Sequence, residues 1–153
     1  MRIDGERIYL RPLTTDDVSF EYVSWLNDPE VTEHLATQRA TVGSVLAYVR
    51  EKNADDDILF LGIFDKKDNE HIGNVKCEFI HLPEVELGIL LGNKKYWGKG
   101  LGSETVDTIT KFIFENYENS EKVYLKVYTN NKRAIKCYEK AGFKQVSFME
   151  RRK

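Results

Sequence analysis

Three glycines alternate within YWGKGLGSE, residues 96–104, directly before a run with helical periodicity. Gly98, Gly100 and Gly102 weaken a chain when they stand this close together, because each loses extra backbone entropy on folding. Glycines also let successive backbone N–H groups converge on an anion, and a following helix adds the positive end of its dipole. The stretch therefore predicts a phosphate-binding loop. A tight strand-to-helix turn without a ligand is the alternative.

The spacing of these glycines excludes two familiar phosphate motifs. The dinucleotide fingerprint G-x-G-x-x-G needs a glycine at position 103, where Ser103 stands. The Walker pattern ends in Gly-Lys-Ser/Thr after four intervening residues, and the chain has no such run. The loop is therefore expected to hold its anion in another way.

A second group of reactive side chains lies in NKRAIKCYEKAGF, residues 131–143. Asn131 is suited to cap the helix that follows it, and Gly142 to end that helix. The hydroxyl of Tyr138 can give a proton or a hydrogen bond to a leaving group. A core aromatic on an amphipathic helix is the alternative for Tyr138. Cys137 is expected to pack against the sheet.

The histidines and cysteines do not form a metal-ligand pattern. His34, His71 and His81 are not spaced as ligands with Cys77 and Cys137, so we expect no metal. Two cysteines outside a C-x-x-C pair favour a reducing, cytoplasmic setting. The N-terminus lacks the apolar core of a signal peptide, and no apolar run approaches the roughly 20 residues that span a bilayer.

The composition is typical of one globular domain covering residues 1–153. Apolar residues make up 41% and charged residues 31% of the 153 positions. The formal charge of −2 at pH 7 gives no reason to expect a nucleic acid or an acidic membrane surface as a partner.

Strands and helices must position these residues, and their periodicity predicts an α+β domain. Alternating residues predict strands over 6–13, 58–65, 71–80, 85–92 and 122–129, with a polar hairpin turn at 66–70. Helical spacing predicts helices from the caps at 14–17 to Leu26, over 42–52, from about Ser103 to Tyr117, and after Asn131. One further strand is predicted within 144–153.

The two reactive blocks together resemble the GNAT superfamily of N-acetyltransferases. Its motif Arg/Gln-x-x-Gly-x-Gly/Ala corresponds here to Trp97-Gly98-Lys99-Gly100-Leu101-Gly102. Trp97 departs from the usual Arg/Gln, but YWGKG is typical of the branch that acetylates ribosomal-protein N-termini and of its sugar- and drug-modifying relatives. The second block is similar to the family's N-x-x-A-I-x-x-Y-E-K-x-G-F, at the correct distance downstream.

The resemblance implies a mixed, mostly antiparallel central sheet, splayed between its fourth and fifth strands and flanked by about four helices. Relatives usually continue beyond the second block with two strands, and only one is predicted in 144–153. The final strand is therefore expected to be missing. An open acceptor site, a strand supplied by a partner chain and a natural truncation remain as explanations, and the protein is expected to be a monomer or a homodimer.

The resemblance also implies acetyl-coenzyme A as the acetyl donor. Backbone amides across 98–103 would grip its pyrophosphate, while residues 89–91 and Asn131 would contact the pantetheine arm. The implied donor-binding residues are Ile89, Leu90, Leu91, Trp97, Gly98, Lys99, Gly100, Leu101, Gly102, Ser103 and Asn131.

In a direct attack by an amine, Tyr138 would protonate the leaving thiolate and Glu86 would take a proton from the amine. Glu84, Glu78, His81 and an ordered water are alternatives to Glu86 as the base. Certain relatives that act on N-terminal peptides carry a Glu five residues before the Asn, where this chain has Lys126.

The acceptor is expected to contact Trp25, Asn27, Glu33 and His34, within WLNDPEVTEHL. It would be a small primary amine, an amino sugar on a nucleotide carrier or a protein N-terminus. The alternative to an enzyme is a catalytically silent module that binds acyl-coenzyme A.

Overall fold

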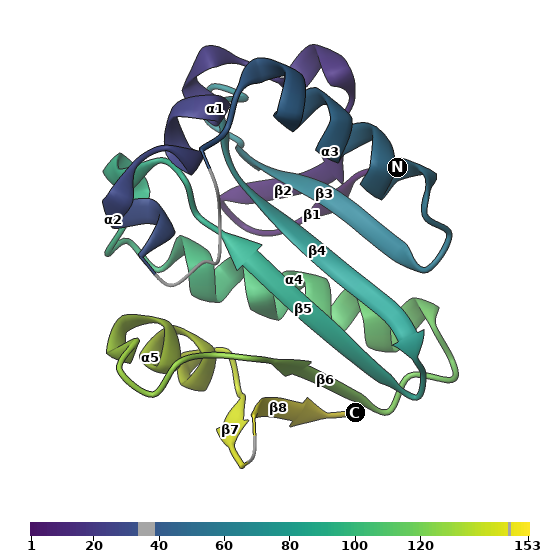
Figure 1. The fold of residues 1–153 in the computed structure, drawn as a ribbon. Coiled ribbons are helices and arrows are strands. Elements are labelled where there is room, and N and C mark those ends of the chain that lie inside the picture. The colour runs from purple at the N-terminus through teal and green to yellow at the C-terminus, as the bar shows by residue number, and fades with distance from the viewer. Residues whose placement is uncertain (34–38, 147) are drawn as a thin grey trace.

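One mixed sheet of eight strands forms the centre of the molecule (Figure 1). The computed structural model describes residues 1–33, 39–146 and 148–153. The strand order is β1-β2-β3-β4-β5-β6-β8-β7, and every neighbouring pair is antiparallel except β5 and β6. The strands are β1 (Ile3–Asp4), β2 (Ile8–Pro12), β3 (Ile58–Asp65), β4 (His71–His81), β5 (Glu84–Leu90), β6 (Lys122–Leu125), β7 (Lys144–Gln145) and β8 (Met149–Arg152).

The parallel pair β5 and β6 parts along its length. Its register joins Glu84 to Lys122 and ends where Glu86 meets Tyr124, although β5 continues to Leu90. From that point the two strands diverge, as Figure 1 shows. These are the strands predicted at 85–92 and 122–129, so the predicted splay is confirmed.

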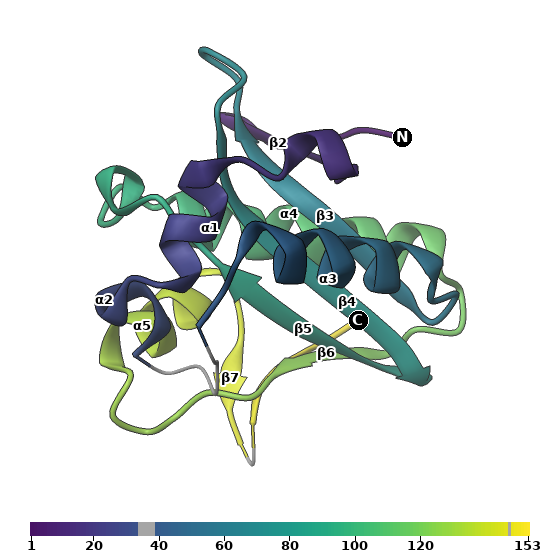
Figure 2. The same cartoon turned by 45° about the horizontal axis from the view of Figure 1, so that its top comes forward.

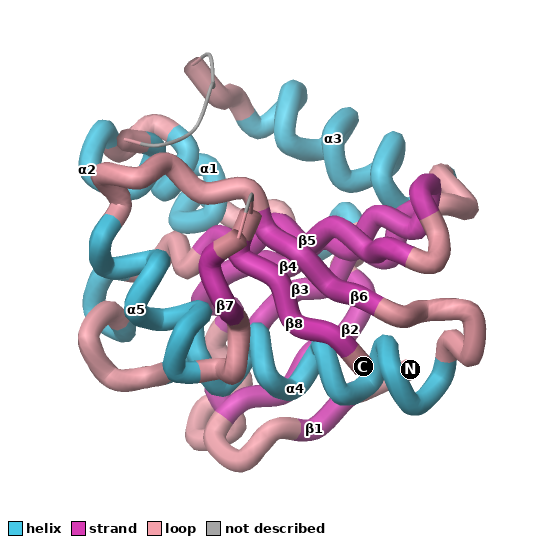
Figure 3. Tube along the Cα trace, turned by 90° about the horizontal axis from the view of Figure 1, so that it is seen from below, coloured by secondary structure: helices cyan, strands magenta, loops and turns pink. Residues whose placement is uncertain are grey.

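Helices cover both faces of the sheet (Figures 2 and 3). One face carries α1 (Phe20–Leu26), α2 (Pro29–Thr32) and α3 (Val42–Ala54). The other face carries α4 (Leu101–Asn116) and α5 (Lys132–Lys140). Because a sheet covered on both sides buries two apolar faces, the core has two clusters, one around Trp25 and Val49 and the other around Ile109 and Val123.

The helix boundaries follow the cap chemistry of the sequence. Thr41 and Ser44 form a capping box at the start of α3, and Asn131 accepts from the backbone N–H of Ala134 at the start of α5. The predicted helix that starts at the 14–17 caps is divided in two. Thr14 caps a short 3-10 turn over Thr15–Asp17, and α1 begins only after Ser19, its own cap.

The prediction of a single strand at the C-terminus was wrong. The chain forms two short strands there, and β8 pairs with both β6 and β7, so the second strand is present within this chain. The turn between them lacks glycine and proline, and Val146 N–H donates to the carbonyl of Phe148. Because residues 144–152 contain no glycine or proline that would signal a turn, the sequence predicted one strand where the structure has a hairpin.

Candidate active site

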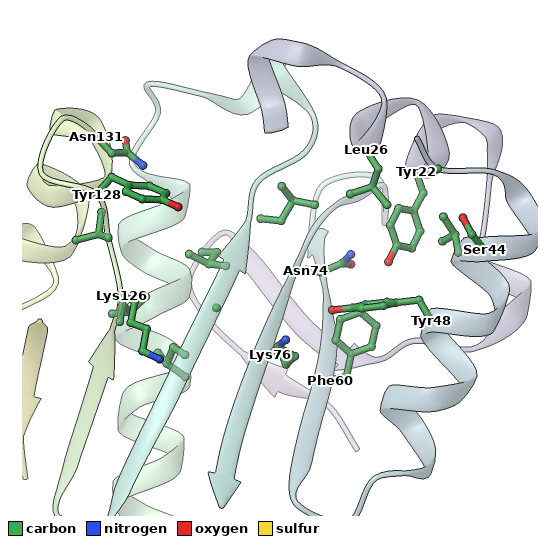
Figure 4. A pocket seen from close by; sticks show the side chains of 18 of the residues that line it. Tyr22, Leu26, Ser44, Tyr48, Phe60, Asn74, Lys76, Lys126, Tyr128 and Asn131 are labelled. Atoms are coloured by element: carbon green, nitrogen blue, oxygen red, sulfur yellow. The ribbon is translucent and has the colours of Figure 1, made fainter. Parts of the chain in front are cut away.

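A cleft of about 990 Å³ opens where β5 and β6 part (Figure 4). Its walls come from α1 and α3, from the strands β3 to β6, and from α5. The lining includes Tyr22, Leu26, Arg39, Ser44, Tyr48, Phe60, Asn74, Lys76, Leu87, Gly88, Ile89, Leu90, Leu125, Lys126, Val127, Tyr128, Asn131 and Tyr138. A space of this size, between diverging strands and open to solvent, can hold an extended ligand and a second reactant.

Residues predicted to contact the donor meet in this cleft, whereas no residue of the glycine block, 96–104, is in its lining. Ile89 and Leu90 line the cleft from β5. Tyr138 lines it from α5, and Asn131, the residue before α5, lines it as well. Leu91 lies one residue beyond β5, and its carbonyl accepts a hydrogen bond from the indole N–H of Trp97 at 2.7 Å. This bond fastens the glycine loop to the end of β5.

Two of the three alternating glycines have a backbone that only glycine adopts readily. Gly98 has φ of 74° and Gly100 has φ of 80°, in the left-handed region. A Cβ on Gly98 would meet nothing within 4 Å. A Cβ on Gly100 would lie 3.4 Å from an Arg7 guanidinium nitrogen and 3.5 Å from the Lys140 ammonium. The loop therefore presents backbone beside cations at the start of α4, an arrangement suited to an anion.

Gly102 has a different role from the other two glycines. It lies within α4, which begins at Leu101 and not near Ser103 as predicted, and a Cβ there would lie 3.1 Å from the sulfur of Cys137. The missing side chain lets α4 pack closely against α5. Ser103 is buried in the first turn of α4, and Lys99 is exposed in the loop.

The glycine loop is connected through Arg7 to the acidic side chain of Glu104. Glu104 accepts hydrogen bonds from the backbone N–H groups of Arg7 and Ile8, at 2.8 and 3.1 Å, and from the Arg7 guanidinium at 2.8 Å. Arg7 also donates to the carbonyl of Lys99 at 2.8 Å. On the other side, the guanidinium of Arg133 lies 3.8 Å from the ring centre of Trp97. Arg7, in the segment between β1 and β2, and Arg133, in α5, thus both contact the loop.

Tyr138 lines the cleft and is buried, with 8% of its surface exposed. Burial raises the pKa of its hydroxyl above the ordinary value, so the hydroxyl stays protonated near neutral pH. Burial likewise raises the pKa of the neighbouring Cys137 thiol to about 11. Because a thiol is a weak nucleophile until it ionises, this environment gives Cys137 little reactivity.

Glu86 lies beside the cleft and not in its lining. Its carboxylate accepts a hydrogen bond from the hydroxyl of Tyr124 at 3.2 Å, and the ammonium of Lys126 is 3.7 Å away. Burial, together with Glu86, raises the pKa of Tyr124 to about 12. Glu86 therefore lies at the point where β5 and β6 separate, two residues before Gly88 on the same strand.

Trp25, Asn27 and Glu33, three of the four predicted acceptor residues, lie at the C-terminal ends of α1 and α2, and none of these three is in the lining of the cleft. Trp25 is 5% exposed; its ring packs on Gly92 and lies edge-on to the ring of His71. Asn27 exchanges two hydrogen bonds of 2.8 Å with the backbone of Ala40 and joins α1 to the segment before α3. Glu33 is exposed just after α2. His34 lies outside the described residues.

Several polar residues of the cleft were not predicted from the sequence, among them Tyr22, Tyr48, Asn74 and Lys76. Asn74 and Lys76 alternate with the buried Val75 and Cys77 along β4. This alternation was the available signal, since it places two polar side chains on the face that α1 and α3 cover. Asn74 is buried, and its Oδ1 accepts from Nε2 of His71 at 2.7 Å.

Within the described part of the chain, no three His, Cys, Asp or Glu side chains gather in a way that could hold a metal ion. None of the helices described there is both long and apolar enough to cross a membrane.

A family model for the acetyltransferase (GNAT) domain matches residues 7–144. An uncharacterised protein of Methanocaldococcus jannaschii is 25% identical over 146 residues, which cover 94% of this chain and 29% of that protein. The chain thus spans less than a third of this relative's length.

Solved structures share the fold. A GNAT-family acetyltransferase from Bacillus anthracis superposes with a TM-score of 0.83 at 16% identity, over 98% of this chain and 95% of its own. An aminoglycoside acetyltransferase in complex with coenzyme A and kanamycin superposes with a TM-score of 0.80 at 24% identity, over 95% of each chain. At these identities the likeness concerns the fold.

Proposed function

The chain belongs to the GNAT family of acetyltransferases, and from this premise we propose that it transfers an acetyl group from acetyl-coenzyme A to a primary amine. The observation that carries the proposal is a cleft lined by the parted strands and Tyr138, with the glycine loop fastened to the end of β5 by the hydrogen bond from Trp97 to Leu91. A structural relative is a complex of an aminoglycoside acetyltransferase with coenzyme A and kanamycin, a donor product and an amine in one fold.

The donor is held by backbone groups more than by side chains. The amides of residues 98–103 bind its pyrophosphate, helped by the N-terminus of α4 and by the Lys140 and Arg7 cations next to Gly100. Ile89 and Leu90 lie on β5 beyond its pairing with β6, and Leu91 follows them, so the backbone on this edge can bind the pantetheine arm as a neighbouring strand would. Asn131 contacts the same arm, and Trp97 secures the loop through Leu91.

The chemistry proceeds by direct attack. The amine nitrogen bonds to the thioester carbonyl carbon, the carbon–sulfur bond breaks, and the thiolate leaves. Tyr138 donates a proton to this sulfur, since its raised pKa keeps the hydroxyl protonated. The acceptor ammonium loses one proton before attack and the nitrogen loses a second afterwards, so the products are an amide, a free thiol and one released proton.

Glu86 is the proposed base, acting on the amine directly or through a water. It lies at the point where the strands separate, and its hydrogen bond from Tyr124 orients the carboxylate. The ammonium of Lys126 lies 3.7 Å from the same carboxylate. Trp25, Asn27, Glu33 and His34 stay the predicted acceptor residues, with a small amine or a protein N-terminus as the acceptor.

Substitution of Tyr138 tests the proposal. Tyr138→Phe keeps the packing and removes the proton donor, so kcat is expected to fall by about 10²- to 10⁴-fold while acetyl-coenzyme A still binds. Tyr117→Phe is the matched control, because Tyr117 stacks on Phe79 at the far end of α4. Thiol release measures turnover with a panel of amines, and mass spectrometry identifies the acetylated product.

Two outcomes would contradict the proposal. An unchanged kcat in Tyr138→Phe would remove Tyr138 from the chemistry. Saturable binding of acetyl-coenzyme A without turnover on any amine would instead favour the silent acyl-coenzyme A-binding module.

A further inference from the structure

The charged side chains that line the cleft carry one sign. Among the residues that the structure describes, these are Arg39, Lys76 and Lys126, and no aspartate or glutamate lines the cleft. Residues 34–38, next to Arg39 in the sequence, are HLATQ and contain no carboxylate either. A site that accepts a molecule with several ammonium groups needs carboxylates to face them, because like charges placed opposite each other disfavour binding.

The two lysines stand on opposite sides of β5 within the cleft (Figure 4). Lys76 projects from β4 in the row that joins Phe60, Lys76 and Gly88 across three strands. Lys126 follows β6 on the other side of the opening. The cleft therefore has one lysine on each side of β5.

Neighbouring side chains position the ammonium group of Lys76 on this face of the sheet. Its ammonium lies 3.3 Å from a carboxylate oxygen of Glu78, which is outside the cleft lining. Burial alone would lower the pKa of Lys76, but Tyr48 and Glu78 outweigh it and raise the pKa above its ordinary value. The side chain is thus charged near neutral pH, and its contacts with Glu78 and Tyr48 leave one of its three N–H donors for a ligand.

Neutral donors adjoin Lys76 on the same surface. Asn74 is 6% exposed, and its oxygen is occupied by the hydrogen bond from His71. Burial lowers the pKa of His71, so its ring is neutral and adds no charge there. Figure 4 shows the rings of Tyr22 and Tyr48 directed toward Asn74 and Lys76. The amide nitrogen of Asn74 and these hydroxyls can donate to the same anionic group as Lys76.

We propose that the acceptor is a small amine that also carries a carboxylate or a phosphate, and that Lys76 binds this anionic group. The inference rests on the proposed acetyl transfer and narrows its substrate class. Polyamines and aminoglycosides are poor substrates of this cleft, because each brings several positive charges to a lining with three cations and no described carboxylate.

Pairs of amines that differ in one anionic group test this inference. The pairs are ethanolamine with O-phosphoethanolamine, glucosamine with its 6-phosphate, and serinamide with serine, and spermidine and kanamycin serve as polycations. Within a pair whose anionic group the cleft binds, the anionic member is expected to have a kcat/KM at least about tenfold higher than its partner. A tenfold ratio corresponds to the free energy of one charge-assisted hydrogen bond. The first two pairs report on phosphate and the third on carboxylate.

Substitution of the lysine locates the effect. Lys76→Met keeps much of the side-chain volume and is expected to reduce the anionic preference to about one, and Lys76→Glu to reverse it. Lys111→Met on α4 is the control, since Lys111 is exposed, pairs with Asp107 and is not in the cleft lining. Both members of a pair are measured on one preparation, so a partial loss of folded protein cancels from their ratio.

The outcomes separate this inference from the proposed function. Equal kcat/KM within every pair, faster turnover of spermidine or kanamycin, or a preference unchanged by Lys76→Met would overturn the inference and leave acetyl transfer standing. Saturable acetyl-coenzyme A binding with no turnover on any of these amines would overturn the proposed function, and the inference with it.

Discussion

Gly88 separates the requirements of the cleft from those of the fold. It lies in β5 opposite Lys76, its φ is not in the left-handed region, and a Cβ there would meet nothing within 4 Å. Replacing a glycine in such a position stabilises a protein by about 0.4–1 kcal/mol, because the unfolded chain loses freedom. Valine also suits a strand. Gly88→Val should therefore raise Tm by about 1–4 °C, at about 2–4 °C per kcal/mol for a chain of this size.

The same substitution should impair activity. The new side chain would project into the cleft beside Lys76, where the amine and the thioester must meet. Overfilling a packed site costs about 1–3 kcal/mol, which is roughly 5- to 150-fold in kcat/KM. Gly88→Ala, with one methyl group, should show a smaller loss and a similar gain in stability.

Thermal unfolding and steady-state thiol release measure the two effects on the same samples. Gly43→Ala in α3 is the matched control, because a Cβ there has its nearest neighbour, Thr41 Oγ1, at 3.8 Å and lies outside the cleft lining. This control should gain stability and keep its activity. Wild-type kcat/KM in Gly88→Val would refute the assignment of the reaction to this cleft, and a lower Tm would show that β5 itself needs the glycine.

Three further predictions concern the loop, its support and the proton donor. Gly98→Ala should lose about 1 kcal/mol of stability and bind acetyl-coenzyme A more weakly, whereas Gly98→Asn should retain stability because asparagine tolerates a left-handed backbone; equal Tm values for the two variants would contradict this. Glu104→Gln should destabilise the protein by about 1–3 kcal/mol near neutral pH. Burial would raise the pKa of Glu104, but the hydrogen bonds from Arg7 and Ile8 outweigh it and lower the pKa, so this contribution is complete above its ordinary value of 4.5 and is lost as the pH falls below it. Denaturant titrations should thus show the difference between the two proteins shrinking as the pH falls below 4.5, and a constant difference would be evidence against the ion pair. Because burial raises the pKa of Tyr138, kcat should not decline from about pH 8 to pH 10 through its ionisation; a decline that Tyr138→Phe abolishes would show that the hydroxyl ionises earlier.

Local signals in the sequence predicted most of the elements. The alternation of 58–65 and 71–80, with a polar turn between them, corresponds to β3 and β4, and the helix after Asn131 begins and ends as its cap residues indicate. These predictions succeeded because caps and periodicity depend on residues close together in the chain. The C-terminal hairpin was missed for the same reason, since its turn has no local signal.

The sequence by itself determined the family, the glycine loop and the presence of Tyr138 in the block of residues 131–143, because these depend on residue types at short spacing. Tertiary structure decided how the three glycines divide their roles, with Gly98 and Gly100 in the left-handed region and Gly102 against Cys137. It also decided that Lys76 and Lys126 face one cleft from two strands. Such proximity follows from the divergence of β5 and β6 and from the packing of α3, which join residues far apart in the chain, so no local pattern could reveal it.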